Sequence, residues 1–160
     1  MRSVLAVLVL MLMISCTSDA VISETQALSG LWNKDEPVRF QFEQLDSLKT
    51  YNMFITIRHT NAYKYNNLFL ISSLRYPHGK TVTDTLEFRL AQPDGQWIGT
   101  GLGSVKEMKL WYKEGIQFAE KGNYNITITH AVRNNGEVDG VKLLEGISDV
   151  GFAIEKAPKQ

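Results

Sequence analysis

Residues 38–58 read VRFQFEQLDSLKTYNMFITIR, and they hold two segments in which every second side chain is apolar. The first segment has apolar residues at positions 38, 40 and 42, and the second has them at positions 51, 53, 55 and 57. A period of two is the spacing of strands with one buried face, because successive side chains of a strand point to opposite sides. The stretch therefore predicts two β-strands separated by a polar connection.

The rest of the chain continues this pattern, and no segment shows a helical stripe. Residues 81–90 alternate clearly, with Val82, Leu86 and Phe88 on one face. Residues 65–74 are apolar on both faces, which is typical of a central strand that is covered on two sides. Further strands are predicted at residues 96–99, 106–113, 116–119, 123–133 and 148–156.

The connections carry the residues that tight turns require. Residues 76–79 (YPHG) and 92–95 (QPDG) place proline at the second turn position and glycine at the fourth. Residues 134–136 (NNG) indicate a type I′ hairpin. About nine short strands with such turns predict an all-β fold, a two-sheet antiparallel sandwich of Ig-like or jelly-roll kind, whose strand order the pattern leaves open.

The N-terminus has the features of a secretory signal peptide. Arg2 supplies a positive charge, residues 4–14 are an unbroken apolar run, and Ser15 is a small residue before Cys16. The run is too short to span a bilayer, which takes about 20 apolar residues. Residues 13–16 (MISC) resemble the lipobox of bacterial lipoproteins. That resemblance implies cleavage before Cys16, a diacylglycerol on its thiol and an acyl chain on the new N-terminus.

The cysteine count and the composition support this interpretation. Cys16 is the only cysteine, so the exported chain forms no intrachain disulfide and lipidation accounts for its thiol. Cleavage leaves 160 − 15 = 145 residues, enough for one domain. The 17 basic and 17 acidic residues form no long run of either sign, so nothing predicts a nucleic-acid partner or a polybasic membrane contact.

Three segments are therefore expected. Residues 1–15 are a removed signal peptide, residues 16–36 a lipidated N-terminus with a polar tether, and residues 37–160 the β-sandwich domain. Leu31 and Trp32 are the exceptions within the tether, where they add an apolar contact or a short edge strand.

A series of short motifs then resembles the GldH gliding-motility lipoproteins. The motifs are YNMFITIR (51–58), YKYNNL (63–68), DTLE (84–87), GQWIGTGLG (95–103), GNY (122–124), the strand ending at Arg133, and GISDVGF (146–152). In order and spacing they cover nearly the whole mature domain, behind a lipoprotein signal.

This resemblance implies a non-enzymatic cell-envelope lipoprotein needed for bacterial gliding, in a machinery linked to type nine protein secretion. It implies an outer-membrane location facing the periplasm, protein partners in the envelope, and no cofactor beyond the lipid on Cys16. Members also occur in bacteria that do not glide, so secretion or envelope assembly is the more general role.

The sequence shows no pattern typical of a metal site or of a catalytic nucleophile. His59, His78 and His130 lie in separate segments, with no spacing that places two metal ligands on one face. We expect His130 to lie in the core or at a strand end and His78 to lie in a solvated turn. The serines lack a nucleophile-elbow pattern, and the acylated cysteine is lost as a nucleophile.

Two other patterns also favour structural roles. The glycines at positions 99, 101 and 103 lack the spacing of a phosphate loop, so we expect bulges or close backbone packing there. Asp84 and Glu87 are an odd number of residues apart, which places them on opposite faces of a strand and not in a glycosidase pair. The sequence therefore predicts a protein that is not an enzyme and binds neither a metal nor a small-molecule substrate.

A protein-binding surface is the leading hypothesis for a functional site. Tyrosine, arginine and asparagine side chains stack and hydrogen-bond at interfaces, and they gather after the second predicted strand and at one later strand end. The candidate partner-binding residues are Arg58, Tyr63, Tyr65, Asn66, Asn67 and Arg133. In the alternative, the tyrosines cap the core and the arginines pair with acids such as Asp84 or Asp149.

The second hypothesis is a lipid-anchored carbohydrate-binding module. It requires Trp97, Trp111 or Tyr63 to be exposed in a coplanar platform for a sugar ring. Against it, large aromatic residues dominate β cores, so Trp97 and Trp111 are expected to be core or half-core residues.

Overall fold

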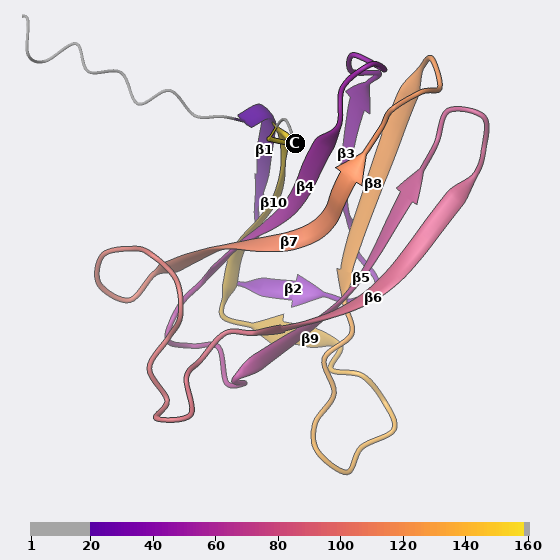
Figure 1. The fold of residues 1–160 in the computed structure, drawn as a ribbon. Helices are drawn as coiled ribbons and strands as arrows, with labels where there is room; N and C mark the ends of the chain where they lie inside the picture. The colour runs from indigo at the N-terminus through magenta and orange to yellow at the C-terminus, as the bar shows by residue number, and fades with distance from the viewer. Residues whose placement is uncertain (1–19, 159–160) are drawn as a thin grey trace, which may run out of the picture.

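The computed structural model describes residues 20–158, which form ten antiparallel strands and contain no helix able to cross a membrane (Figure 1). The predicted signal peptide and Cys16 lie outside the described residues. The strands are β1 (Ala20–Ala27), β2 (Leu31–Asn33), β3 (Val38–Glu43), β4 (Tyr51–His59), β5 (Asn67–Arg75), β6 (Thr81–Arg89), β7 (Lys106–Ile116), β8 (Asn123–His130), β9 (Leu143–Glu145) and β10 (Ile147–Lys156). The predicted all-β class is confirmed.

Two four-stranded sheets make up the sandwich. Sheet A has the order β1-β10-β4-β7, and sheet C has the order β3-β8-β5-β6. A third, two-stranded ribbon of β2 and β9 lies at one end and was not expected from the sequence. Only β5 and β6 are paired neighbours in the chain, so every other pairing joins strands that are distant in sequence.

The core forms where the inward faces of the two sheets meet. The four apolar residues expected on one face of β4, Tyr51, Met53, Ile55 and Ile57, are at most 2% exposed. Phe42 of sheet C lies opposite them, and its ring centroid is 5.2 to 5.8 Å from those of three other core aromatic rings. Burial of each large apolar side chain stabilises the fold by about 1.5–3 kcal/mol.

The expected tether is wrong from Ala20 onward, because residues 20–27 form the edge strand β1. It pairs with β10 from Ala20 opposite Glu155 to Ala27 opposite Asp149, with one register shift between Ala20 and Ile22. Without β1, the ten-residue strand β10 would leave a row of backbone donors and acceptors unpaired along one side. A solvent-exposed edge strand needs few apolar side chains, so the polar composition of this segment does not predict a strand. The short strand anticipated around Leu31 and Trp32 is β2.

Three further boundaries differ from the expectation. Residues 96–99 form only an isolated bridge, between Ala91 and Trp97. Residues 116–119 are not a separate strand, because β7 continues to Ile116 and Phe118 reaches the core from the following loop. The eighth strand ends at His130 and not at residue 133.

Two of the three predicted turns are confirmed by their hydrogen bonds. The Gly79 amide donates to the Tyr76 carbonyl (3.0 Å), and the Gly95 amide donates to the Gln92 carbonyl (2.9 Å). The type I′ turn is wrong, because a type I′ turn needs positive φ at both central residues and here only Gly136 has it. A single positive φ at the third position is the requirement of a type II turn.

The sandwich has two distinct ends. At the proximal end β1 begins and β10 finishes, beside the loops at residues 44–50, 76–80 and 117–122. At the distal end lie the β2–β9 ribbon and the loops at residues 60–66, 90–105 and 131–142 (Figure 1). The antiparallel pairing sets this division, since each strand of the two four-stranded sheets starts at one end and finishes at the other.

Gly146 provides a test of the distal packing. It has φ of +89°, and a Cβ there would lie 2.2 Å from the backbone nitrogen of Tyr63. Gly136 also has positive φ (+81°) but has open space around it. We expect Gly136→Ala to lower the free energy of unfolding by about 1–2 kcal/mol, the cost of a left-handed alanine. Gly146→Ala should cost clearly more, because the backbone of loop 60–66 must also move. Urea unfolding of both variants measures the difference, and equal costs would contradict the close packing.

Candidate functional site

The two tyrosines among the candidate residues form hydrogen bonds at the distal end. Tyr63 is only 2% exposed, and its hydroxyl donates to the backbone carbonyl of Asn67 (2.7 Å). Burial raises the pKa of Tyr63, so the hydroxyl remains a protonated donor. Tyr65 is half-buried, and its hydroxyl donates to Oδ1 of Asn134 in the loop at residues 131–142 (2.7 Å). The two rings meet edge to face at 5.6 Å. Tyr65 thus joins loop 60–66 to the loop at residues 131–142, whereas the Tyr63 hydroxyl bonds within its own segment, at the start of β5.

The two candidate asparagines differ in whether their side chains already have a hydrogen-bond partner. The backbone carbonyl of Asn66 accepts hydrogen bonds from the amides of Leu90 (2.8 Å) and Ala91 (3.1 Å), and the residue itself is exposed. Asn67 begins β5, where its side-chain amide donates to Glu87 on the neighbouring strand β6 (2.8 Å). Asn66 is thus available at the surface, whereas the Asn67 side chain already has a partner.

The two arginines lie on different parts of the distal end. Arg58 is on the outer face of sheet A, where its guanidinium forms an ion pair with Glu107 of the adjacent strand β7. The hydrogen bond that Arg58 donates to Glu107 raises the pKa of Arg58, and the charge of Asp149 adds to the effect. Arg133 is exposed in the loop at residues 131–142, where its backbone bridges to Gly140.

All six candidate residues therefore lie toward the distal end, but they do not form one surface. Tyr63 is a core residue, as the alternative interpretation predicts, so its side chain is not available to contact a partner. Arg58 does pair with an acid, although that acid is Glu107 and neither of the two that were named. Asp84 instead binds Lys113 across the gap between the two sheets (2.7 Å).

The coplanar platform that the carbohydrate hypothesis requires is absent from the described residues. Trp97 is half-buried, as expected, and it packs edge-on against His59 with centroids 4.6 Å apart. Its ring is inclined by 55° to that of the buried Tyr63. Trp111 is 56% exposed, which contradicts its placement in the core, and it lies on the outer face of sheet A near the proximal end.

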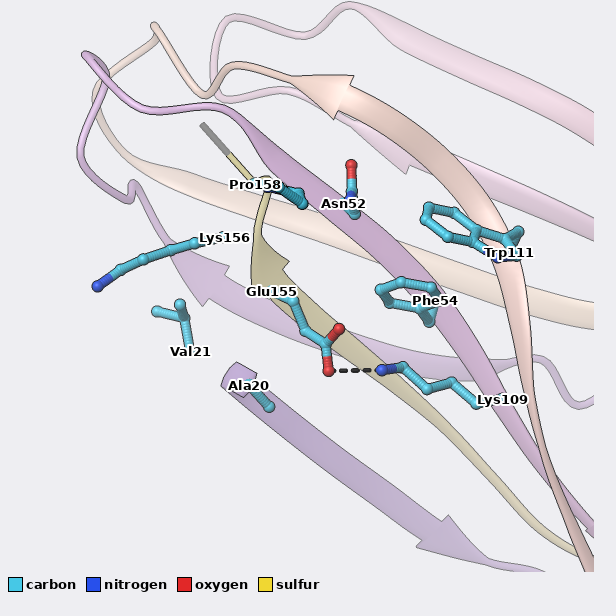
Figure 2. A pocket seen from close by; sticks show the side chains of 9 residues that line it. All are labelled: Ala20, Val21, Asn52, Phe54, Lys109, Trp111, Glu155, Lys156 and Pro158. Atoms are coloured by element: carbon cyan, nitrogen blue, oxygen red, sulfur yellow. Dashed lines mark hydrogen bonds and ion pairs between the residues drawn. The ribbon is translucent and has the colours of Figure 1, made fainter. Parts of the chain in front are cut away.

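An aromatic hollow that the sequence did not predict surrounds Trp111 (Figure 2). It encloses about 960 Å³ on the outer face of sheet A, between the start of β1 and strand β7. Its lining residues are Ala20, Val21, Asn52, Phe54, Lys109, Trp111, Glu155, Lys156 and Pro158. The hollow lies at the proximal end, so it is separate from the six predicted residues.

Phe54 forms the floor of this aromatic hollow. The alternation of β4 points its ring outward, away from the core, yet the side chain is only 5% exposed. The ring of Trp111 covers it at 4.5 Å, and the Lys109 ammonium lies 4.1 Å above its centroid while pairing with Glu155. The signal in the sequence was an apolar residue at an outward position of β4, but its partner Trp111 is 57 residues away and only the β4–β7 register brings them together.

Comparison with known proteins identifies the family. A family model described as GldH lipoprotein matches residues 20–154, which is nearly the whole described domain. The chain belongs to the GldH lipoprotein family. Membership implies a lipid-anchored protein of the cell envelope, and it confirms the resemblance found in the sequence motifs.

Two curated relatives match almost end to end. The gliding motility lipoprotein GldH homolog of Christiangramia forsetii is 47% identical, with 98% of this chain and 99% of the relative covered. The gliding motility lipoprotein GldH of Flavobacterium johnsoniae is 45% identical, with 97% and 96% covered. Among solved structures, the infectious bursal disease virus Gx strain is similar over 86% of this chain and 36% of the viral chain, with 11% identity. Its TM-score of 0.39 is too low to bear on fold or function.

The glycine and acid patterns of this GldH lipoprotein have the structural roles that were expected. A Cβ at Gly99 would lie 2.6 Å from the Glu107 carbonyl oxygen, and one at Gly101 would lie 2.3 Å from that of Val105. Asp84 is half-buried, whereas Glu87 is exposed on the opposite face of β6. Within residues 20–158, no three His, Cys, Asp or Glu side chains gather as metal ligands.

Two histidines of this GldH protein are buried. His59 is fully enclosed beside Trp97, and His130 is 3% exposed with Nε2 within 2.9 Å of the Trp32 carbonyl. Burial lowers the pKa of both side chains, and the charges of Lys106 and Lys34 lower it further. Carbonyl contacts oppose this shift without reversing it. The folded protein therefore favours the neutral imidazoles.

This burial predicts a stability that falls as the pH drops. The unfolded chain protonates these histidines near pH 6.5, whereas the folded chain does so only at lower pH, so the unfolded state binds more protons. Stability should be full above about pH 7 and decline through pH 6.5 toward the lowered folded pKa values, with a slope of up to about 1.4 kcal/mol per pH unit for each histidine.

Urea unfolding between pH 8 and pH 5.5 measures this slope. His59→Gln and His130→Gln should each reduce it, and His78→Gln, in an exposed turn, is the matched control that should keep it. A slope that survives in the double variant of His59 and His130 would rule out the buried histidines as its source.

Proposed function

We propose that this GldH protein is a non-catalytic lipoprotein of the outer membrane, facing the periplasm, that serves the gliding and type nine secretion machinery through protein–protein contacts. The observation that carries the proposal is family membership over residues 20–154, together with two end-to-end relatives named for gliding motility. The attached lipid is its only expected prosthetic group.

Cys16 is the proposed site of the lipid. It is the only cysteine of the chain, and only Ser15 separates it from an apolar run that is too short to stay in the membrane as a helix. A diacylglycerol on the thiol and an acyl chain on the amino group together exceed the two signals that stable attachment needs. The anchor thus holds the domain at the membrane for the lifetime of the protein.

The distal end is the proposed site of protein contact. Asn66 and Arg133 are exposed there, and the β2–β9 ribbon beside them exposes Leu31 and Leu143. An arginine and an amide beside exposed leucines provide polar and apolar contacts in one region, as protein interfaces do. The hydrogen bonds of Tyr65 and its neighbours hold these loops in place and so reduce the entropy lost on binding.

Labelling of cells with an alkyne fatty acid tests the anchor. The parent protein should take up the label and remain with the membranes, whereas Cys16→Ser should lose both, because the thiol that accepts the diacylglycerol is gone. Ser15→Ala is the matched control, since it keeps a small residue before the cysteine and should retain label and membrane. A Cys16→Ser protein that is still labelled would disprove this attachment site.

Arg133→Glu tests the distal contact. In a deletion strain that expresses the variant, we expect loss of crosslinks to envelope proteins and loss of colony spreading or secretion, because the charge at the interface is reversed. Folding and membrane retention should be unchanged, since Arg133 is exposed in a loop. Arg39→Glu makes the same charge change at an exposed strand residue on the outer face of sheet C and should behave as the parent. Equal effects of the two variants would contradict a distal site.

A further inference from the structure

Exposed apolar side chains surround the proximal end, where the chain emerges from its anchor segment. Trp111 is 56% exposed and Val21 is 41% exposed at the rim of the aromatic hollow (Figure 2). A second hollow of about 790 Å³ adjoins it and shares three lining residues, Asn52, Lys156 and Pro158. Leu48, 89% exposed at the tip of the β3–β4 loop, lies at its edge. Exposed apolar groups on both hollows mark a contact surface.

Chain length places this surface close to the lipid. Three residues lie between Cys16 and Ala20, and the four residue-to-residue steps that join them span at most about 14 Å in an extended chain. Ala20 and Val21 themselves line the aromatic hollow, so its rim lies within that reach of the acylated residue. Because β1 starts at Ala20, no long tether holds the domain away from the bilayer. With Cys16 acylated, the proximal end faces the membrane surface.

The residue types at this end suit the boundary between lipid and water. Tryptophan is enriched at the level of the lipid headgroups, where its ring is partly in apolar surroundings and its N–H is solvated. Lysine side chains reach past apolar surface and leave the ammonium in water. Here Trp111 and Leu48 supply the apolar groups, while the exposed Lys156 lines both hollows.

Phe54, at the floor of the aromatic hollow, is covered by other side chains of the protein even when no lipid is bound. The Lys109 ammonium, paired with Glu155, lies over its ring, and the tilted ring of Trp111 also packs on it, so the deepest apolar group is not left in water. Trp111 is the group that stays accessible. An acyl chain or glycerol region of a neighbouring lipid can thus meet Trp111 and Val21 without displacing core side chains.

We propose that the proximal end, with Trp111, Val21 and Leu48, rests in the headgroup region of the phospholipid bilayer that carries the Cys16 lipid. The inference rests on the proposed acylation of Cys16. It gives the protein a defined orientation, in which the long axis of sheet A stands away from the membrane. β1 alone spans about 25 Å, so the distal end is held clear of the headgroups and open to proteins.

A single introduced cysteine can report the orientation, because the acylated Cys16 no longer reacts with an alkylating probe. We would label Leu48→Cys with an iodoacetamide of the environment-sensitive dye NBD, in the full lipidated protein bound to phosphatidylethanolamine vesicles. Leu102→Cys is the matched control, since Leu102 is 95% exposed in a distal loop. The probe at position 48 should shift to the blue when vesicles are added, and the probe at position 102 should not.

The aromatic hollow is tested on the same vesicles with brominated phosphatidylcholine, which quenches tryptophan at short range. The parent protein should lose part of its emission, and Trp111→Phe should abolish that loss, because Trp32 is a buried distal residue and Trp97 also lies in the distal half. Identical quenching in the parent and the variant would overturn the contact, as would a blue shift at position 102 instead of 48. A shift at position 48 that varies with protein concentration at fixed lipid would assign the surface to a second copy and overturn it as well.

Flotation of each sample separates the two failures. Protein that floats with the vesicles while the probes at position 48 and Trp111 remain in water refutes the membrane contact and leaves the anchor intact. Protein that does not float refutes acylation of Cys16, and the proposed contact falls with it.

Discussion

The pairing of β10 with both β1 and β4 is the interaction on which the rest of this structure depends. The last strand of the chain lies between the first strand and the strand that carries the centre of the core. Sheet A is incomplete until the C-terminal residues arrive, because β4 would otherwise have a neighbour on one side only. Pairings of such long sequence separation must be formed against the entropy of closing long loops, which makes folds of this kind slow to form.

This arrangement also links the anchor to the core. β1 runs from the anchor segment directly into the ladder of β10, so a force on the lipid acts on a row of backbone hydrogen bonds and not on a loose tether. The hydrogen bonds in such a ladder share a load applied along the strand.

The two ends of the sandwich carry different chemistry. The proximal end combines exposed tryptophan and leucine with lysine beside the anchor, whereas the distal end combines tyrosine-linked loops with exposed asparagine and arginine. The buried pair of histidines lies in the distal half, where His59 packs under Trp97 and His130 beside Trp32. A neutral imidazole fills a core position while still offering one nitrogen to a carbonyl, and this allows the distal loops to be packed onto the sheets.

The sequence by itself determined the all-β class, most of the strands, the inward face of β4, two of the turns and the family. The class, the strands, the inward face and the turns follow from the period of the side chains and from local turn chemistry, which act over a few residues, whereas the family follows from the resemblance of the motifs. The sequence pattern does not predict β1, because an edge strand depends on its backbone partners more than on apolar side chains. Here those partners are residues 149–155. Only the tertiary structure decided that Tyr63 is core, that Trp111 is exposed over Phe54, and that the six candidates and the aromatic hollow lie at opposite ends. Exposure and proximity depend on which distant strands pair and in what register, and side-chain periodicity carries no information about that.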